Sequence, residues 1–151
     1  MSRLWEKGLP LDARILRYTA GEDHQLDARL VPHDVRGSIA HVEMLAEQGL
    51  ISTEDCAAIR DGLNALNSSF AAGDWHISLD DEDAHSALET RLTTAIGAAG
   101  GRLHLGRSRN DQVLTALRLY LRDAARDIAD GVTGLRSSLS DLCERQGDIE
   151  L

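Results

Sequence analysis

The sequence predicts an all-α protein, and three features of its 151 residues support this prediction. Aromatic residues make up only 3% of the chain, a composition that suits interdigitating helices better than stacked sheets. The two prolines are Pro10 and Pro32, so no proline interrupts a helix in the remaining 119 residues. Apolar residues recur every three or four positions over most of that length, which is the period of an amphipathic helix.

Residues 1–33 are expected to form an irregular arm, because glycines and prolines separate short apolar pieces that show no sustained period. Asp34 then has the residue type of an N-cap, and the helical pattern that follows it stops at Gly49. A second core-facing helix is expected to begin at Ser52 and to end before Gly73.

The acidic run Asp80-Asp81-Glu82-Asp83 would favour the start of a third helix, because negative charge is stabilised at a helix N-terminus. This third helix carries apolar positions from Ala84 to Ile96. The glycines that follow it, up to Gly106, are expected to form a loop.

The last helix has an apolar stripe from Val113 to Leu142, with steps of three or four residues. A stripe of some thirty residues would be roughly 45 Å long at 1.5 Å per residue, too long for three short helices to cover. We therefore expect residues 1–105 to form a small helical domain and residues 106–151 to begin a central bundle. Further sequence or other subunits would complete that bundle.

The formal net charge of −9 repels nucleic acid and anionic lipid, so neither is expected as a partner, and any anion site must be a local cluster. The chain lacks an apolar run of about 18 residues and a signal-peptide pattern, which favours a cytoplasmic protein without a membrane span. Cys56 and Cys143 match no metal spacing and are expected to be reduced thiols. Neither a metal ion nor a cofactor is expected.

The segment Arg107-Ser108-Arg109-Asn110 lies between a glycine-rich loop and the start of the last helix. Free backbone N–H groups and the helix dipole attract anions there, and the two guanidinium groups, the hydroxyl and the carboxamide add donors that suit a carboxylate. Arg109 is expected to face the ligand and Arg107 to form a structural ion pair. The alternative is that Ser108 or Asn110 is only an N-cap and that the arginines are solvated.

The segment His104–Val113 resembles the His-Thr-Gly-Arg-Ser-Arg-Asn-Asp-Gln-Val segment of argininosuccinate lyases. Residues 81–92, with Asp-Glu-Asp-Ala-His and then Glu-x-Arg-Leu, resemble another segment of that family, and residues 34–41 resemble its N-terminal region. The resemblance is strong at 80–122 and loose at 1–30. It implies a helix bundle of the fumarase/aspartase type and the β-elimination of argininosuccinate to fumarate and arginine, a step of arginine biosynthesis.

The resemblance also assigns roles to single residues. It implies that three residues contact the carboxylates of the fumarate moiety, namely Ser108, Arg109 and Asn110. It places Asp27 and Asp83 near the substrate or among the residues that order the site; for Asp83 the alternative is a plain helix-start carboxylate. The residues expected to support the site are Arg107, His85, Asp111 and Gln112.

His85 is read more readily as a packed or capping group than as a catalyst. The other histidines have no metal-ligand spacing and are read as structural or solvated. Two positions depart from the family pattern: Leu105 stands where a threonine is common, and Asp23 stands where many members have a serine.

In the family, the catalytic histidine and the serine base come from segments beyond those that match residues 1–151, and each active site is shared among three subunits of a tetramer. We therefore expect this chain to hold no catalytic residue, to supply only the dicarboxylate-anchoring wall and to be inactive by itself. The alternatives are a non-catalytic helical oligomerisation module, a dicarboxylate-binding module, or another lyase of the fumarase/aspartase superfamily.

Overall fold

The computed structural model describes residues 14–15, 18 and 21–148, and this part of the chain contains helices and no strand. The all-α prediction is confirmed. The elements, in chain order, are α2 (Asp23–Leu26), η1 (Asp27–Arg29), α3 (Val31–Glu47), α4 (Thr53–Ala72), η2 (Leu79–Asp81), α5 (Ala84–Ile96), η3 (Gly97–His104) and α6 (Arg109–Gln146), where η denotes a 3-10 helix.

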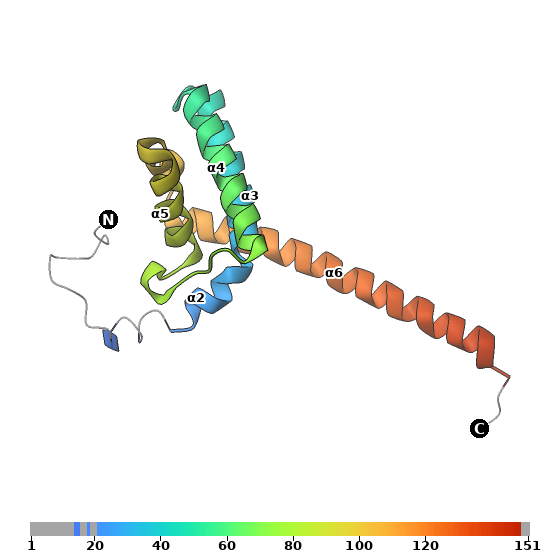
Figure 1. The fold of residues 1–151 in the computed structure, drawn as a ribbon. Helices are drawn as coiled ribbons and strands as arrows, with labels where there is room; N and C mark the ends of the chain where they lie inside the picture. The colour runs from blue at the N-terminus through green and yellow to red at the C-terminus, as the bar shows by residue number, and fades with distance from the viewer. Residues whose placement is uncertain (1–13, 16–17, 19–20, 149–151) are drawn as a thin grey trace.

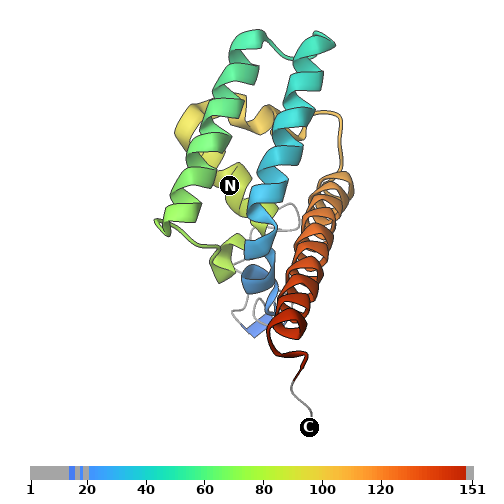
Figure 2. The same ribbon diagram turned by 90° about the vertical axis from the view of Figure 1, so that its right-hand side faces the viewer.

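Helices α3 and α4 lie side by side as an antiparallel pair, and α5 packs beside them, mainly against α4 (Figure 1). The segment η3 folds back over α5, and α6 then crosses α3 and runs on alone. The second view shows α6 on the side of α3 that faces away from α4 (Figure 2). Helix α3 therefore contacts both α5 and α6, although α5 packs more extensively on α4.

The start of α3 differs from the expectation of an irregular arm through residue 33. Residues 23–29 form short helical turns, and α3 begins at Val31 without a side-chain cap. Pro32 sits in the first turn, where its missing N–H costs no helical hydrogen bond. The rest of the expected arm lies largely outside the described residues.

Asp34 is not an N-cap. It lies inside α3 and is 1% exposed. The N-cap preference of aspartate was outweighed here by a helix start three residues earlier and by buried partners for the carboxylate, described below.

The second and third helices begin and end close to the predicted residues. Ser52 caps α4 by accepting a hydrogen bond from the Asp55 N–H, and Gly73 ends it in the left-handed conformation with φ of 82°. Asp83 caps α5 by accepting from the Ser86 N–H. These two starts and the Gly73 stop were readable from the sequence.

The glycine-containing segment after α5 was expected to be a loop, but it forms the 3-10 helix η3. Gly100 allows this segment to press against α5, because a Cβ added there would lie 2.7 Å from the Cα of Thr93. Its glycines thus allow close packing as well as a change of direction.

The hydrophobic core fills the space between α3, α4, α5 and η3. Its fully buried side chains include Val42, Ile59, Leu63, Leu92 and Leu103. Helix α6 contributes to this interior only near its start, through Gln112 and Ala116. The crossing of α3 and α6 is close at Gly37, where an added Cβ would lie 3.1 Å from Cγ2 of Thr115.

The remainder of α6 is uncovered, as its length predicted. The helix has 38 residues, or about 57 Å at 1.5 Å per residue, and exceeds the expected length. Its exposed apolar residues, called the apolar seam below, are Leu114, Leu117, Leu121, Ile128, Val132, Leu135, Leu139 and Leu142.

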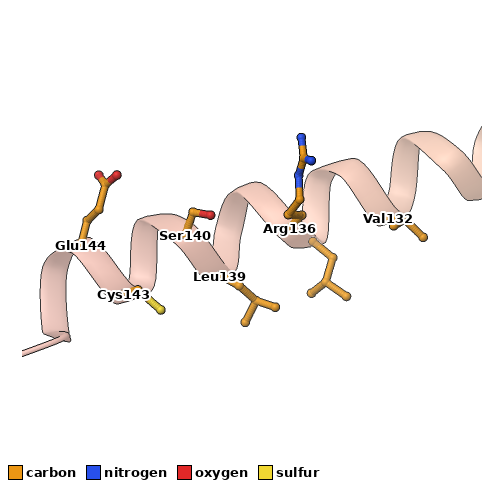
Figure 3. Close-up of a pocket in the computed structure, with 7 residues that line it drawn as sticks. Val132, Arg136, Leu139, Ser140, Cys143 and Glu144 are labelled. Carbon is orange, nitrogen blue, oxygen red and sulfur yellow. The ribbon is translucent and has the colours of Figure 1, made fainter.

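Near the C-terminal end of α6 the apolar and polar side chains separate clearly. Val132, Leu139 and Cys143 project to one side of the helix, and Arg136, Ser140 and Glu144 to the other (Figure 3). This is the amphipathic pattern of a helix that has a partner in a bundle. Among the helices that the structure describes, none is both long enough and apolar enough to cross a membrane.

Candidate functional site

The segment predicted to bind an anion forms the start of α6. Ser108 is the N-cap, and its hydroxyl and backbone N–H both donate to Oδ2 of Asp111, at 3.0 and 2.9 Å. The Asp111 N–H donates in return to the Ser108 hydroxyl at 3.4 Å, which completes a capping box. The backbone N–H groups of Arg109 and Asn110 are first-turn donors that this box does not use.

Arg109 connects the start of α6 to the first turns of α5. Its Nη1 donates to the hydroxyl of Ser86 at 2.8 Å and lies 3.3 Å from Oδ2 of Asp83. Its Nη2 lies 3.7 Å from a carboxylate oxygen of Glu89. The Arg109 side chain is 39% exposed, so part of the guanidinium group remains open to a ligand.

The start of α5 brings the two predicted aspartates together. Asp83 caps the helix through the Ser86 N–H at 2.7 Å, and Oδ2 of Asp27 accepts from the Ala84 N–H at 3.2 Å. Asp27, Asp83 and Arg109 thus meet at one place, although they come from three separate segments of the chain. The carboxylate of Asp83 caps the start of α5, which was the alternative expected for it. It also contacts Arg109.

The charges at this place set a limit on what it can bind. Asp27, Asp83 and Glu89 lie around the starts of α5 and α6, where the guanidinium group of Arg109 contacts Asp83 and Glu89, and the buried guanidinium group of Arg107 also feels the charge of Glu89. A dianionic ligand would gain from Arg109 and from the N-terminus of α6, but the carboxylates would repel it. The described donors therefore face a ligand from one side only, and a dianion held by them alone would be bound weakly.

The contacts expected for Arg107 and Arg109 are wrong in one respect. Arg107 was expected to form a structural ion pair, but it donates to the hydroxyl of Ser38 at 2.9 Å, and Arg109 is the arginine paired with carboxylates. Burial lowers the pKa of Arg107, although nearby carboxylates, Asp34 foremost, oppose that shift. Arg107 therefore fastens the loop before α6 to α3.

Behind the loop lies a buried polar cluster centred on Asp34. Its carboxylate accepts from Ser38 at 3.0 Å, from Nδ1 of His85 at 2.7 Å, and from the Gln112 side-chain amide at 2.8 and 2.9 Å. All four residues are buried, with Asp34 at 1% and His85 at 2% exposure. The cluster joins α3, α5 and α6 through side chains alone.

The protonation states in this cluster reinforce each other. Burial raises the pKa of Asp34, but the hydrogen bonds and charge of His85, with those of Gln112 and Ser38, lower it on balance. Burial likewise lowers the pKa of His85, and Asp34, with more distant help from Asp83 and Asp27, raises it on balance. Both shifts favour the charged forms, the carboxylate of Asp34 and the imidazolium of His85.

His85 is a packed group, as the sequence favoured, while the central role of Asp34 was missed. A signal for it was present. Asp34 and Ser38 fall on the same face of α3 as Val31, Val35 and Val42, so polar residues interrupt an apolar stripe at helical spacing. Polar groups on a buried face need partners, and that points to a cluster of this kind.

The remaining predicted positions are placed as follows. Asn110 is exposed at the start of α6. Leu105 is 43% exposed, and its carbonyl accepts a hydrogen bond from His41 at 2.9 Å. The side chain of Asp23 lies outside what the structure describes. Cys56 is buried, Cys143 is exposed, and both are free thiols.

Within residues 14–15, 18 and 21–148, three or more potential metal ligands gather nowhere. His33 lies 3.7 Å from Asp123 and edge-on to Tyr120, and His104 lies 3.5 Å from Glu89. His24 and His76 line a shallow hollow between α2 and the end of α4. His104 therefore borders the group around Arg109, because Glu89 contacts both side chains.

Comparison with known proteins gives one consistent answer. A protein-family model described as "Lyase" matches residues 12–151. The chain is similar to the argininosuccinate lyase of Sorangium cellulosum, at 46% identity over 99% of this chain and 35% of that protein. It is also similar to those of Saccharophagus degradans, at 50% identity over 92% of this chain and 29% of that protein, and of Thermotoga neapolitana, at 40% over 98% and 37%. The chain thus spans about a third of the length of these relatives.

Proposed function

The chain belongs to the lyase family, and from this premise we propose that it forms the dicarboxylate-anchoring wall of an active site that eliminates fumarate from argininosuccinate. The observation that carries the proposal is the start of α6, where Ser108, Arg109 and Asn110 lie beside the capped start of α5. The relatives that match this chain are named argininosuccinate lyases, which supports that substrate.

Elimination from such a substrate removes a proton next to a carboxylate and then expels the guanidinium nitrogen. The electron pair left by the proton spreads onto that carboxylate, so negative charge grows there in the transition state. The guanidinium group of Arg109 and the N–H groups of Arg109 and Asn110 are donors that suit this growing charge. Residues outside this chain would act as the base and the acid.

Asp83 and Glu89 would keep the Arg109 guanidinium in place before the substrate arrives. Both carboxylates contact it, and Ser86 adds a hydrogen bond. A guanidinium group has five N–H donors, so these contacts leave donors for a substrate carboxylate. Asp27 would act more indirectly, by fixing the start of α5 through Ala84.

The proposal extends to assembly and location. Residues 106–151 would begin the central bundle of a homotetramer, and residues 1–105 would form a smaller helical domain beside it. The apolar seam supports this, because soluble proteins rarely leave such a stripe uncovered. Neighbouring subunits would then add positive charge opposite Arg109 and strengthen binding. A biosynthetic lyase of this kind would work in the cytoplasm.

Calorimetric titration with succinate, a stable dicarboxylate, tests the proposed anchoring site. The unmodified chain should bind succinate, and Arg109→Ala should weaken binding roughly 10- to 100-fold, as expected for the loss of hydrogen bonds between charged groups. Arg126→Ala is the matched control, because Arg126 is an exposed arginine of α6 paired only loosely with Asp123, at 3.6 Å. Equal affinity in all three chains would contradict the proposal.

The apolar seam favours a second candidate, a helical oligomerisation module without catalysis. This module would assemble through the seam and show no dependence on Arg109. Succinate binding that Arg109→Ala abolishes would argue against it, whereas assembly without any dicarboxylate binding would favour it.

A further inference from the structure

One buried carboxylate connects the three helices that surround the anion site. Asp34 lies in α3, yet it accepts hydrogen bonds from α5 through His85, 51 residues away, and from α6 through Gln112, 78 residues away. Ser38 links the same carboxylate to Arg107 in the loop before α6. None of these residues is among those proposed to touch the ligand.

The two partners of Asp34 stand close behind the ligand groups in sequence. His85 follows Ala84, the first residue of α5, and Gln112 lies one turn after Arg109, the first residue of α6. Helices α5 and α6 have few contacts with each other, whereas α6 packs extensively on α3. The distance from Arg109 to Asp83 therefore depends on how both helix starts are fixed to α3.

The chemistry of the cluster requires an acceptor at residue 34. An ionised carboxylate has about four acceptor positions and no donor, which suits the hydroxyl, imidazolium and amide groups that all donate to Asp34. Asparagine keeps the shape but has one acceptor oxygen and a donor NH₂. Rotation of the Gln112 amide would accommodate that NH₂, because Oε1 of Gln112 is buried with no partner among the described atoms. Such a variant would fold, but with a rearranged link to α6.

We propose that Asp34 is a positioning residue of the anion site: by holding His85 and Gln112 at once, it sets the start of α6 against the start of α5, so that Arg109 meets Asp83 and Ser86. This inference rests on the proposed function for its ligand, a dicarboxylate. The positioning itself concerns only residues of this chain.

The test compares Asp34→Asn with Asp123→Asn in the 151-residue chain. Asp123 is the matched control, because it also links α3 to α6, through Arg36 at 2.5 Å, but lies eleven residues beyond Gln112 and in an exposed position. NMR spectra without ligand should show shifted resonances for Ser86, Ser108 and the Arg109 side chain in Asp34→Asn and unshifted ones in Asp123→Asn. Loss of a group that orients a metal ligand costs about 10- to 100-fold in metal affinity or activity, and by analogy succinate affinity should fall about tenfold in Asp34→Asn only.

A double-mutant cycle separates positioning from a general loss of stability. Gln112→Met keeps the side-chain length and the Asp34–His85 pair but removes the link to α6. If Asp34 acts through Gln112, the two substitutions together should weaken succinate binding no more than Asp34→Asn alone. Additive losses would overturn the inference. Gln112→Met also provides the test if Asp34→Asn does not fold.

Two further outcomes are distinguishable. If Asp34→Asn lowers the free energy of unfolding but leaves the Arg109 resonances and the succinate affinity unchanged, Asp34 is merely structural and the inference is wrong. If the unmodified chain binds no succinate, the proposed function fails, and the resonances of Ser86, Ser108 and Arg109 still decide whether Asp34 positions them.

Discussion

Nδ1 of His85 lies 2.7 Å from Oδ2 of Asp34, and both side chains are almost fully buried. A pair of this kind stabilises a protein only while both groups keep their charges, because an unpaired buried charge is costly. The pKa of His85 is raised and that of Asp34 is lowered on balance. The stability of the chain should therefore depend on pH from both sides.

The dependence of stability on pH follows from the raised pKa of His85 and the lowered pKa of Asp34. His85 contributes fully below its unfolded pKa of about 6.5, and this contribution is lost as pH rises through its higher folded pKa. Asp34 contributes fully above its unfolded pKa of about 3.9, and this contribution is lost as pH falls through its lower folded pKa. Urea unfolding should give a maximal contribution of the pair between about pH 4 and 6.5.

Asp34→Asn should flatten this profile, because the asparagine does not titrate and no longer holds the proton on His85. Asp123→Asn should leave the loss of stability above about pH 6.5 in place, because Asp123 does not contact His85 and its imidazole neighbour, His33, has a lowered pKa and so titrates on the acidic side. An alkaline side that is the same in the unmodified chain and in Asp34→Asn would contradict this prediction.

The two serine N-caps should separate stability from binding. Ser52 caps α4 away from the site, and Ser108 caps α6 within it. Replacing either by alanine should lower the free energy of unfolding by about 1 kcal/mol. Only Ser108→Ala should also weaken succinate binding, because it loosens the capping box around the proposed donors. Equal loss of affinity in both variants, measured by calorimetry, would show that the start of α6 has no special part in binding.

The apolar seam predicts that the chain self-associates. Leu135→Glu places a charge in the seam and should shift sedimentation-velocity profiles towards the monomer. Leu50→Glu is the matched control, since Leu50 lies between α3 and α4 and is 61% exposed, against 62% for Leu135. A chain that is monomeric at every concentration, or that responds equally to both substitutions, would contradict the role of the seam.

Two glycines should respond to alanine in opposite directions. At Gly100 an added Cβ would lie 2.7 Å from the backbone of Thr93, so Gly100→Ala should cost about 1–3 kcal/mol in the free energy of unfolding. At Gly131, inside α6, an added Cβ meets nothing within 4 Å, and alanine should stabilise that helix by about 0.5–1 kcal/mol. Chemical denaturation measures both changes. An unchanged free energy of unfolding in Gly100→Ala would mean that η3 can shift away from α5 at little cost.

The helices were predictable where local chemistry decides them. Ser52, Gly73 and the apolar periods of α4, α5 and α6 act through near neighbours in sequence, so the pattern alone identifies those elements. The start of α3 and the helix η3 were not predicted. In both places tertiary packing outweighs a local preference, that of Asp34 for a cap and that of the glycines for a loop.

The candidate site was predictable to a similar degree. The resemblance marked Asp27, Asp83 and Arg109, and these residues do lie together. The sequence did not reveal that Arg109 is paired with Asp83 or that Arg107 contacts Ser38, because those contacts depend on how α5 and α6 rest on α3. The cluster at Asp34 was missed for the same reason, since His85 and Gln112 lie 51 and 78 residues after Asp34 along the chain.

The central claim is that the start of α6 anchors a dicarboxylate, and mapping succinate binding by backbone NMR tests it most directly. The account predicts that the amide resonances of Arg109 and Asn110 shift most as succinate is added, with smaller shifts at Ser86. Saturating shifts centred on any other part of the chain, or none at all, would contradict it.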